Sequence, residues 1–299
     1  MDAVQDRFVT LRGMRFHYRD WGGDGRPAVL LHGLASSCRT WDYVAPLLRP
    51  HFRVLALDQR AHGETDKPDD GYDFDSVTED LQAFLSAMTL EAPLLVGHSW
   101  GCSVVLEYAA KRAQDLTGIV MVDGGFGGLG DHPGRSWEQM WEQLAPPDLT
   151  AYTPDQLMER IRSRSGIPWT PEREAILMAQ FIVTPRGTVT PQLSRENHKK
   201  ILRAMWERSS SGQPLIAQCP ALMMPCRQSG DGVDQERMRR KEAGVQEAGV
   251  RLPVSRTIWM EDSVHDVQLQ RPESVAQAIT DAFTDGFFSS RSGQAQVAT

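Results

Sequence analysis

Apolar and polar positions along this chain predict a repeated order of strands and helices. Uninterrupted apolar runs are typical of strands buried on both faces of a parallel sheet. Such runs lie at residues 27–32, 52–58, 94–98 and 117–123. Segments with helical periodicity separate them, and the clearest is 74–88, where Val77, Leu81, Phe84, Leu85 and Met88 share one face. This alternation predicts an α/β fold with a doubly wound, mostly parallel sheet.

The pattern changes twice outside this region. Residues 8–12 and 14–20 read as an opening strand pair, so 117–123 is the sixth strand. From Gly125 to Gln218 no strand is expected, and the helical segments there are 137–144, 154–164, 171–181 and 193–207. Strands at 220–226 and 253–260 and helices at 234–248 and 272–283 then resume the alternation.

These patterns predict three parts of the chain. Residues 1–126 and 216–288 form an α/β core, and residues 127–215 form a helical cap inserted after the sixth strand. The Ser/Gly/Gln-rich residues 289–299 are expected to be a disordered tail.

Composition and charge argue against some classes of binding partner. The chain has 299 residues, 24% of them charged, and its net charge of -7 argues against nucleic acid and anionic membrane surfaces. No apolar run approaches the roughly 20 residues that cross a bilayer, and the N-terminus does not read as a signal peptide. The four cysteines form no C-x-x-C pair and are expected to be buried free thiols. A cytoplasmic location is therefore expected.

The pentapeptide Gly97-His98-Ser99-Trp100-Gly101 is the leading candidate for chemistry. It joins an apolar run to a helix-like segment at 103–112. A serine at such a turn is strained, and flanking glycines let strand and helix approach closely. The strain exposes Ser99 Oγ as a candidate nucleophile, and the helix start presents free N–H groups to whatever it attacks.

Four motifs together resemble the α/β-hydrolase family over essentially the whole expected ordered length. They are Leu31-His32-Gly33-Leu34, Asp58-Gln59-Arg60-Ala61-His62-Gly63, Gly97-His98-Ser99-Trp100-Gly101 and His265-Asp266-Val267-Gln268-Leu269-Gln270-Arg271-Pro272. Their order and spacing fit the family. The resemblance implies an α/β-hydrolase fold and a serine hydrolase that works without a cofactor.

Among eight histidines, His265 is the expected general base, because its loop follows the last strand and faces the nucleophile strand. The resemblance gives His32 and His62 loop-shaping positions and His98 a packing position. It also implies that the backbone N–H groups of Leu34 and Trp100 form the oxyanion hole. The 58–63 motif is read as a structural loop.

The acid that orients His265 has two candidates. Most of the family places it after the strand equivalent to 220–226, where Asp231 lies slightly beyond the usual spot. Some lactonases and dehalogenases of the family place it at the end of the preceding strand, where Asp123 lies. Both choices preserve the Ser–Asp–His order along the chain. We favour Asp123 and keep Asp231 as the alternative.

The expected substrate is a small, largely apolar ester or lactone. A stripe of Trp137, Met140, Trp141 and Leu144 is read mainly as packing, and further cap aromatics would suit an apolar or ring-bearing acyl group. Those further aromatics are Trp169, Phe181 and Trp206. Metal ligation is not indicated, because no cluster has ligand spacing. The oligomeric state stays open, with a homodimer as one option.

Three alternatives remain from the sequence. A proline iminopeptidase-like aminopeptidase needs a cap carboxylate for the substrate amine, and the candidates are Glu138, Glu142, Glu159 and Glu172. Carbon–carbon bond hydrolases, hydroxynitrile lyases and perhydrolases share the same motifs. A non-enzymatic ligand-binding member of the fold is the third. Dehalogenases and epoxide hydrolases are disfavoured, because they normally carry aspartate at the position of Ser99.

Overall fold

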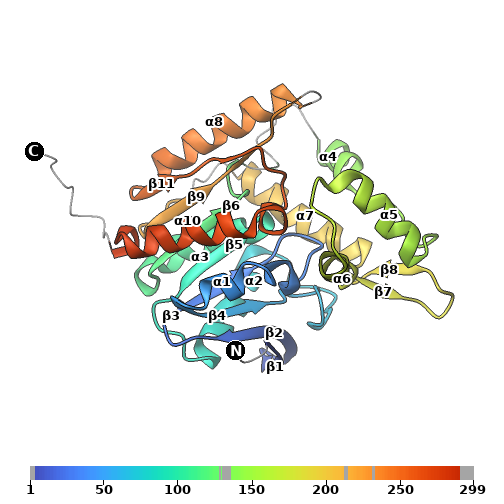
Figure 1. Cartoon of the computed structure of the whole chain (residues 1–299), viewed down its shortest axis with the longest axis horizontal. Helices are drawn as coiled ribbons and strands as arrows, with labels where there is room; N and C mark the ends of the chain where they lie inside the picture. Colours follow the sequence, from blue (N-terminus) through green and yellow to red (C-terminus); the bar gives the residue numbers. More distant parts are fainter. Residues whose placement is uncertain (1–3, 128, 130–135, 212–214, 231–232, 290–299) are drawn as a thin grey trace, which may run out of the picture.

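The chain folds around an eight-stranded sheet (Figure 1). The computed structural model describes residues 4–127, 129, 136–211, 215–230 and 233–289. The sheet order is β1-β2-β4-β3-β5-β6-β9-β11. The first three strands in this order pair antiparallel, and all other neighbours pair parallel. The strands are β1 (Gln5–Leu11), β2 (Met14–Gly22), β3 (Arg26–Leu31), β4 (Phe52–Leu57), β5 (Leu94–His98), β6 (Gly118–Val122), β9 (Ala221–Met224) and β11 (Ser255–Thr257).

Helices cover both faces of this sheet (Figure 1). One apolar core contains residues of α2 (Phe74–Ala87) and α3 (Trp100–Arg112), and α8 (Gln235–Arg251) packs on the same side. The other contains residues of α1 (Ala45–Leu48) and α10 (Pro272–Thr284). Successive strand residues enter opposite cores, because side chains alternate along a strand. In β3, for example, Val29 and Leu31 belong to the first core, and Ala28 and Leu30 to the second. The apolar runs thus form doubly covered strands.

The described residues between β6 and β9 form four helices and a hairpin (Figure 1). The helices are α4 (Trp137–Leu144), α5 (Pro154–Ser165), α6 (Pro171–Met178) and α7 (Arg195–Ser210). The expectation of no strand here was wrong: β7 (Phe181–Val183) and β8 (Val189–Pro191) pair antiparallel. Three-residue strands are too short for a period-two pattern to reveal them. The hairpin and helices α5 and α6 share a separate apolar cluster that includes Leu157, Ile176 and Val189.

Both late strands are interrupted, which shapes the edge of the sheet beside the site. The segment expected as one strand at 220–226 divides at Pro225, which has no N–H to donate to a ladder. Its continuation, β10 (Cys226–Arg227), pairs with β12 (Met260–Glu261) in a separate two-stranded sheet. The bend turns the Cys226 backbone N–H toward Asp123, at the end of β6.

Further expectations concern the membrane, the cysteines and the tail. In the part of the chain that the structure describes, no helix combines the length and apolar character needed to cross a membrane. All four cysteines are free and buried. Residues 290–299, nearly all of the expected disordered tail, lie outside the described residues.

Candidate active site

Ser99 lies at a strained turn between β5 and α3. Its φ of 53° and ψ of −116° place it where L-residues are rarely found. Glycines on both sides permit the turn. A Cβ atom at Gly97 would lie 2.4 Å from the carbonyl carbon of Gly101, and one at Gly101 would lie 2.5 Å from the Leu31 carbonyl oxygen. The pentapeptide thus forms a strand–turn–helix elbow with the hydroxyl at its apex.

The fold brings Ser99, His265 and Asp123 into one hydrogen-bonded chain. The Ser99 hydroxyl donates to His265 Nε2 over 2.9 Å. On the other side of the ring, Nδ1–H donates to Asp123 Oδ2 over 2.7 Å. The aspartate side chain is only 2% exposed, whereas that of His265 is 46% exposed. A buried acid therefore orients an accessible base against a strained serine, which is the arrangement needed for nucleophilic catalysis.

Asp123 receives two further donors on its second carboxylate oxygen. The Cys226 backbone N–H donates to Oδ1 over 2.8 Å, and Lys241 Nζ donates to the same atom over 2.7 Å. Burial alone would raise the pKa of Asp123, but the His265 hydrogen bond and the charges of His265 and Lys241 outweigh it and lower the pKa to about 2. The aspartate is therefore ionised at neutral pH. Asp231, the alternative acid, lies outside the described residues.

His265 is held at both its ring and its backbone. Burial lowers the pKa of the imidazole, but the hydrogen bond to Asp123 and its negative charge outweigh burial, and the net pKa is raised. Its carbonyl accepts a hydrogen bond from His98 Nε2–H over 3.0 Å. Burial and the charge of His265 lower the pKa of His98 to about 4, so His98 is neutral at pH 7. The residue before the nucleophile thus contacts the loop that carries the base.

The backbone around Leu34 and Trp100 lies against Ser99, as an oxyanion hole requires. Trp100 is the first residue of α3, and a Cβ atom at Gly33 would lie 3.0 Å from the Cβ of Ser99. Neither the Leu34 nor the Trp100 N–H has an acceptor within the described part of the chain. Both donors are therefore available to a ligand.

Two buried histidines shape the loop that carries Leu34. His32 Nε2 accepts from the Gln59 backbone N–H over 3.0 Å. His62 Nε2 accepts from the Ala35 N–H over 3.2 Å, and its ring stacks on Trp100 at 5.2 Å between centroids. Burial lowers the pKa of both imidazoles, which keeps their acceptor nitrogens unprotonated at neutral pH. These contacts fix the loop beside the nucleophile.

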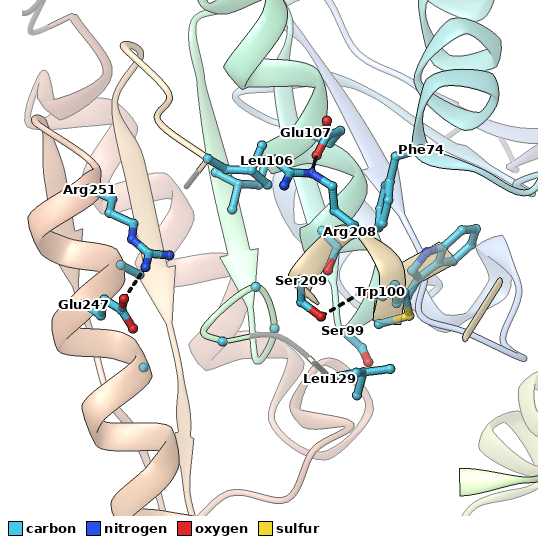
Figure 2. A pocket seen from close by; sticks show the side chains of 18 of the residues that line it. Phe74, Ser99, Trp100, Leu106, Glu107, Leu129, Arg208, Ser209, Glu247 and Arg251 are labelled. Carbon is cyan, nitrogen blue, oxygen red and sulfur yellow. Dashed lines mark hydrogen bonds and ion pairs between the residues drawn. The ribbon is translucent and has the colours of Figure 1, made fainter. Parts of the chain in front are cut away.

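A cavity of about 290 Å³ opens beside Ser99 (Figure 2). Much of its wall is apolar and comes from Phe74, Leu106, Leu129, Met205, Leu215 and Leu252. Two ion pairs also line it, Glu107 with Arg208 at 2.8 Å and Glu247 with Arg251. In Figure 2, Ser99 and Leu129 lie at the lower end, and the Glu107–Arg208 pair lies at the upper end. The cavity suits a small substrate with an apolar body.

The cap aromatics do not line this cavity. Trp137 packs against Trp141 and Trp206, with ring centroids 6.3 and 6.4 Å apart, as expected for packing residues. Trp169 donates its indole N–H to Glu174 over 2.9 Å. The expectation that cap aromatics would suit an apolar or ring-bearing acyl group stays a prediction. Among the described residues, the aromatic rings at the cavity are those of Phe74 and Trp100.

The four cap glutamates proposed for an aminopeptidase also do not line the cavity. Glu138, Glu142, Glu159 and Glu172 are exposed, and none of them lines it. These four residues therefore give no support for a substrate-amine site at this cavity.

A second titratable cluster lies away from Ser99, where β2, the loop after β4 and the short 3-10 helix η1 (Cys38–Trp41) meet. His17, Cys38 and Asp58 lie there with their ligand atoms within 4.8 Å of one another. The sequence did not predict this group. Asp58 Oδ2 accepts from His17 Nδ1 over 2.7 Å, and Oδ1 accepts from the Cys38 backbone N–H over 2.6 Å. Because hydrogen bonds already satisfy the carboxylate, we interpret the cluster as structural.

Three contacts of the site were missed by the sequence analysis. They are the Cys226 N–H and the Lys241 ammonium on Asp123, and His98 on the carbonyl of His265. Lys241 lies within a helix rich in charged residues and 118 positions from Asp123. No local pattern distinguishes it from its charged neighbours, so only the fold identifies it.

Comparison with known proteins identifies a family whose model matches most of this chain. A model described as the alpha/beta hydrolase family matches residues 28–278. N-formylmaleamate deformylase of Pseudomonas putida is 36% identical over 116 residues, which are 38% of this chain and 43% of that protein. Non-heme chloroperoxidase of Streptomyces lividans is 38% identical over 105 residues, 34% of this chain and 38% of that protein. The chain thus matches less than half the length of either relative.

Solved structures extend the likeness to nearly the whole chain. E-2-(acetamidomethylene)succinate hydrolase superposes with a TM-score of 0.72 and 18% identity, covering 94% of this chain and 100% of that one. N-formylmaleamic acid deformylase from Pseudomonas putida S16 superposes with a TM-score of 0.65 and 21% identity, covering 92% and 100%. At these identities the likeness concerns the fold.

Proposed function

The chain belongs to the alpha/beta hydrolase family, and we propose that it is a serine hydrolase that cleaves a carboxylic ester or lactone of a small, largely apolar molecule. The observation that carries this proposal is the hydrogen-bonded chain from Ser99 through His265 to Asp123, with distances of 2.9 and 2.7 Å. A serine hydroxyl alone is too weak an acid to attack an ester, and this chain supplies the base that it needs.

The proposed reaction has two halves. Ser99 Oγ attacks the carbonyl carbon while its proton passes to His265 Nε2, and the Leu34 and Trp100 N–H groups stabilise the oxyanion. His265 then protonates the leaving oxygen, and an acyl-enzyme remains on Ser99. A water molecule, deprotonated by His265, attacks this ester, and His265 returns the proton to Ser99 Oγ as the acid is released. Asp123 stays ionised throughout and stabilises the imidazolium that forms in each half.

The cavity supports the substrate class of the proposal. Its volume of about 290 Å³ and the apolar side chains in its wall favour a small acyl group with an apolar body. The charged side chains that line it already pair with one another, as Glu107 does with Arg208. Among the described residues that line the cavity, each cation therefore already has a carboxylate partner and is less available to a strongly charged acyl group.

The decisive test combines labelling of the nucleophile with a substrate panel. A fluorophosphonate probe should label Ser99 in the wild-type protein and leave Ser99→Ala unlabelled. p-Nitrophenyl acyl esters and aliphatic lactones should be hydrolysed by the wild type, with the Ser99→Ala variant slower by about a thousandfold or more. Full esterase activity in Ser99→Ala would refute the proposal. Labelling without turnover of any ester, lactone or amide would instead favour a ligand-binding protein.

A second candidate is hydrolysis of a small N-acyl amide. The observation that favours it is the 36% identity with N-formylmaleamate deformylase over 116 residues. The same serine, base and oxyanion donors serve both reactions, and the difference lies in how readily the leaving nitrogen is protonated. An N-formyl amide in the substrate panel, measured beside the matching ester, separates the two candidates by their kcat/KM values.

A further inference from the structure

Lys241 contacts the candidate acid from outside the Ser99–His265–Asp123 chain. Its ammonium group donates to Asp123 Oδ1 over 2.7 Å and to the carbonyl of Cys226 over 3.0 Å. The other oxygen of Asp123 receives His265 Nδ1–H. Lys241 and His265 therefore hold the two oxygens of one buried carboxylate from opposite sides.

The helix that carries Lys241 is packed directly on the loop that begins at Asp123. Gly244 lies one turn later on α8, and a Cβ atom there would lie 2.1 Å from the Phe126 carbonyl oxygen. Val245, four positions after Lys241 and so on the same helix face, is buried. The lysine side chain is 20% exposed. Its position is therefore set by close backbone packing, unlike that of a free surface lysine.

We propose that Lys241 is a positioning residue of the catalytic apparatus, which holds the Asp123 carboxylate toward His265 and balances its charge. This inference rests on the proposed serine hydrolase function. A carboxylate with one oxygen tied to Lys241 and the Cys226 N–H cannot rotate away from the imidazole. The lysine also offsets part of the negative charge that stabilises protonated His265.

The positive charge of Lys241 changes the pKa of His265 in a defined direction. Burial lowers the pKa of His265, the hydrogen bond and charge of Asp123 raise it, Asp266 raises it further, and the Lys241 cation lowers it. His98 also faces the ring, with centroids 4.8 Å apart, and is neutral at pH 7. The nearby thiols of Cys102 and Cys226 have raised pKa values and carry no charge. Removing the lysine charge should therefore raise the pKa of His265.

The test compares Lys241→Met, Lys241→Gln and Lys241→Arg with the wild type. The readout is the rate of Ser99 labelling by a fluorophosphonate probe and of p-nitrophenyl butyrate hydrolysis, each from pH 5 to 9. For Lys241→Met we expect about tenfold slower labelling at pH 7. The acid limb of the pH–rate profile should shift to higher pH by about half a pH unit or more. Lys241→Arg should restore the wild-type limb, and Lys241→Gln should keep the shift, because glutamine lacks the charge.

Arg240→Met is the matched control, because it removes one positive charge from the same helix at a side chain whose partner among the described residues is Glu236. Its rate and acid limb should match the wild type. A Lys241→Met protein that loses thermal stability but keeps the wild-type acid limb overturns the positioning role. If Lys241→Met does not fold, the positions of the acid limbs of Lys241→Gln and Lys241→Arg test the positioning role instead. Failure of the wild type to be labelled at Ser99 overturns the proposed function, and the Lys241 role with it.

Discussion

At the scale of single residues, Asp123 connects three distant parts of the chain. It follows β6, accepts from His265 near the end of the chain, and receives Cys226 N–H and Lys241 from the region between them. Its non-glycine φ of 46° is another strained position beside Ser99. Such a backbone is kept only where the surroundings hold it, which agrees with the three hydrogen bonds that this carboxylate accepts.

We predict that Asp123→Asn reduces kcat by about a thousandfold or more, because the amide cannot stabilise the imidazolium and favours the wrong tautomer. Asp231→Asn should change kcat by less than about threefold. Steady-state hydrolysis of p-nitrophenyl butyrate by both variants measures this. The reverse ranking would show that Asp231 is the acid.

The protonation state of His265 should determine how activity depends on pH. It must be neutral to accept the Ser99 proton, and its pKa is raised above the ordinary value of 6.5. Activity should therefore be lost as pH falls through a pKa above 6.5, and kcat/KM should level off at alkaline pH. A pH profile of kcat/KM checks this directly. An acid limb with its midpoint below 6.5 would contradict the assignment of the base.

At the scale of elements, the close approach of β5 and α3 predicts that a side chain added at Gly97 destabilises the fold. Gly97→Ala should lower the free energy of unfolding by about 3 kcal/mol, because the new methyl meets the backbone of Gly101 at 2.4 Å and backbone cannot give way. Gly249→Ala is the control, since its nearest neighbour would be the terminal methyl of Met223 at 3.8 Å. It should be neutral or stabilising by up to about 1 kcal/mol. Urea denaturation of both variants measures the difference.

Helix α8 forms one wall of the cavity and should therefore limit acyl length. Ala248 lines the cavity from this helix, whereas Val250, two positions later, is 87% exposed. Ala248→Trp should lower kcat/KM for p-nitrophenyl octanoate relative to the acetate by at least about tenfold. Val250→Trp should leave that ratio unchanged. Equal ratios in both variants would show that the acyl group lies elsewhere.

At the scale of the whole molecule, the buried His17–Asp58 pair ties β2 to β4 and predicts how stability depends on pH. Burial lowers the pKa of His17, but Asp58 outweighs it and raises the pKa above 6.5. Burial raises the pKa of Asp58, but its hydrogen bonds and nearby histidine charges outweigh this and lower it. The His17 contribution is thus fully present below pH 6.5 and lost as pH rises through the raised pKa, and the Asp58 contribution is lost in acid.

His17→Phe should therefore be less stable than the wild type by about 3 kcal/mol near pH 6, because it leaves a buried carboxylate without its cation. The difference should shrink between pH 6 and 9, as wild-type His17 loses its proton. Urea denaturation of both proteins across this range measures it, and the comparison removes contributions from other groups such as His265. A constant difference over the range would contradict a charged His17.

The strand–helix order and the candidate nucleophile were determined by the sequence itself, because both depend on local spacing. Apolar runs predicted the buried strands, and glycines two positions either side of Ser99 marked the turn. Three-residue strands such as β7 fell below the length at which periodicity is visible. The sequence also named His265 and Asp123, but as one histidine among several and one acid of two.

Only the tertiary structure decided what surrounds those residues. Hydrogen bonds depend on distances that close when segments more than 100 positions apart meet, as for Lys241 and Cys226 on Asp123. The cavity wall was likewise invisible, because it combines helices α3, α7 and α8, whose cavity-facing residues follow no common motif. Local chemistry selected the reacting serine, and the packing of distant elements selected which side chains hold and tune its partners.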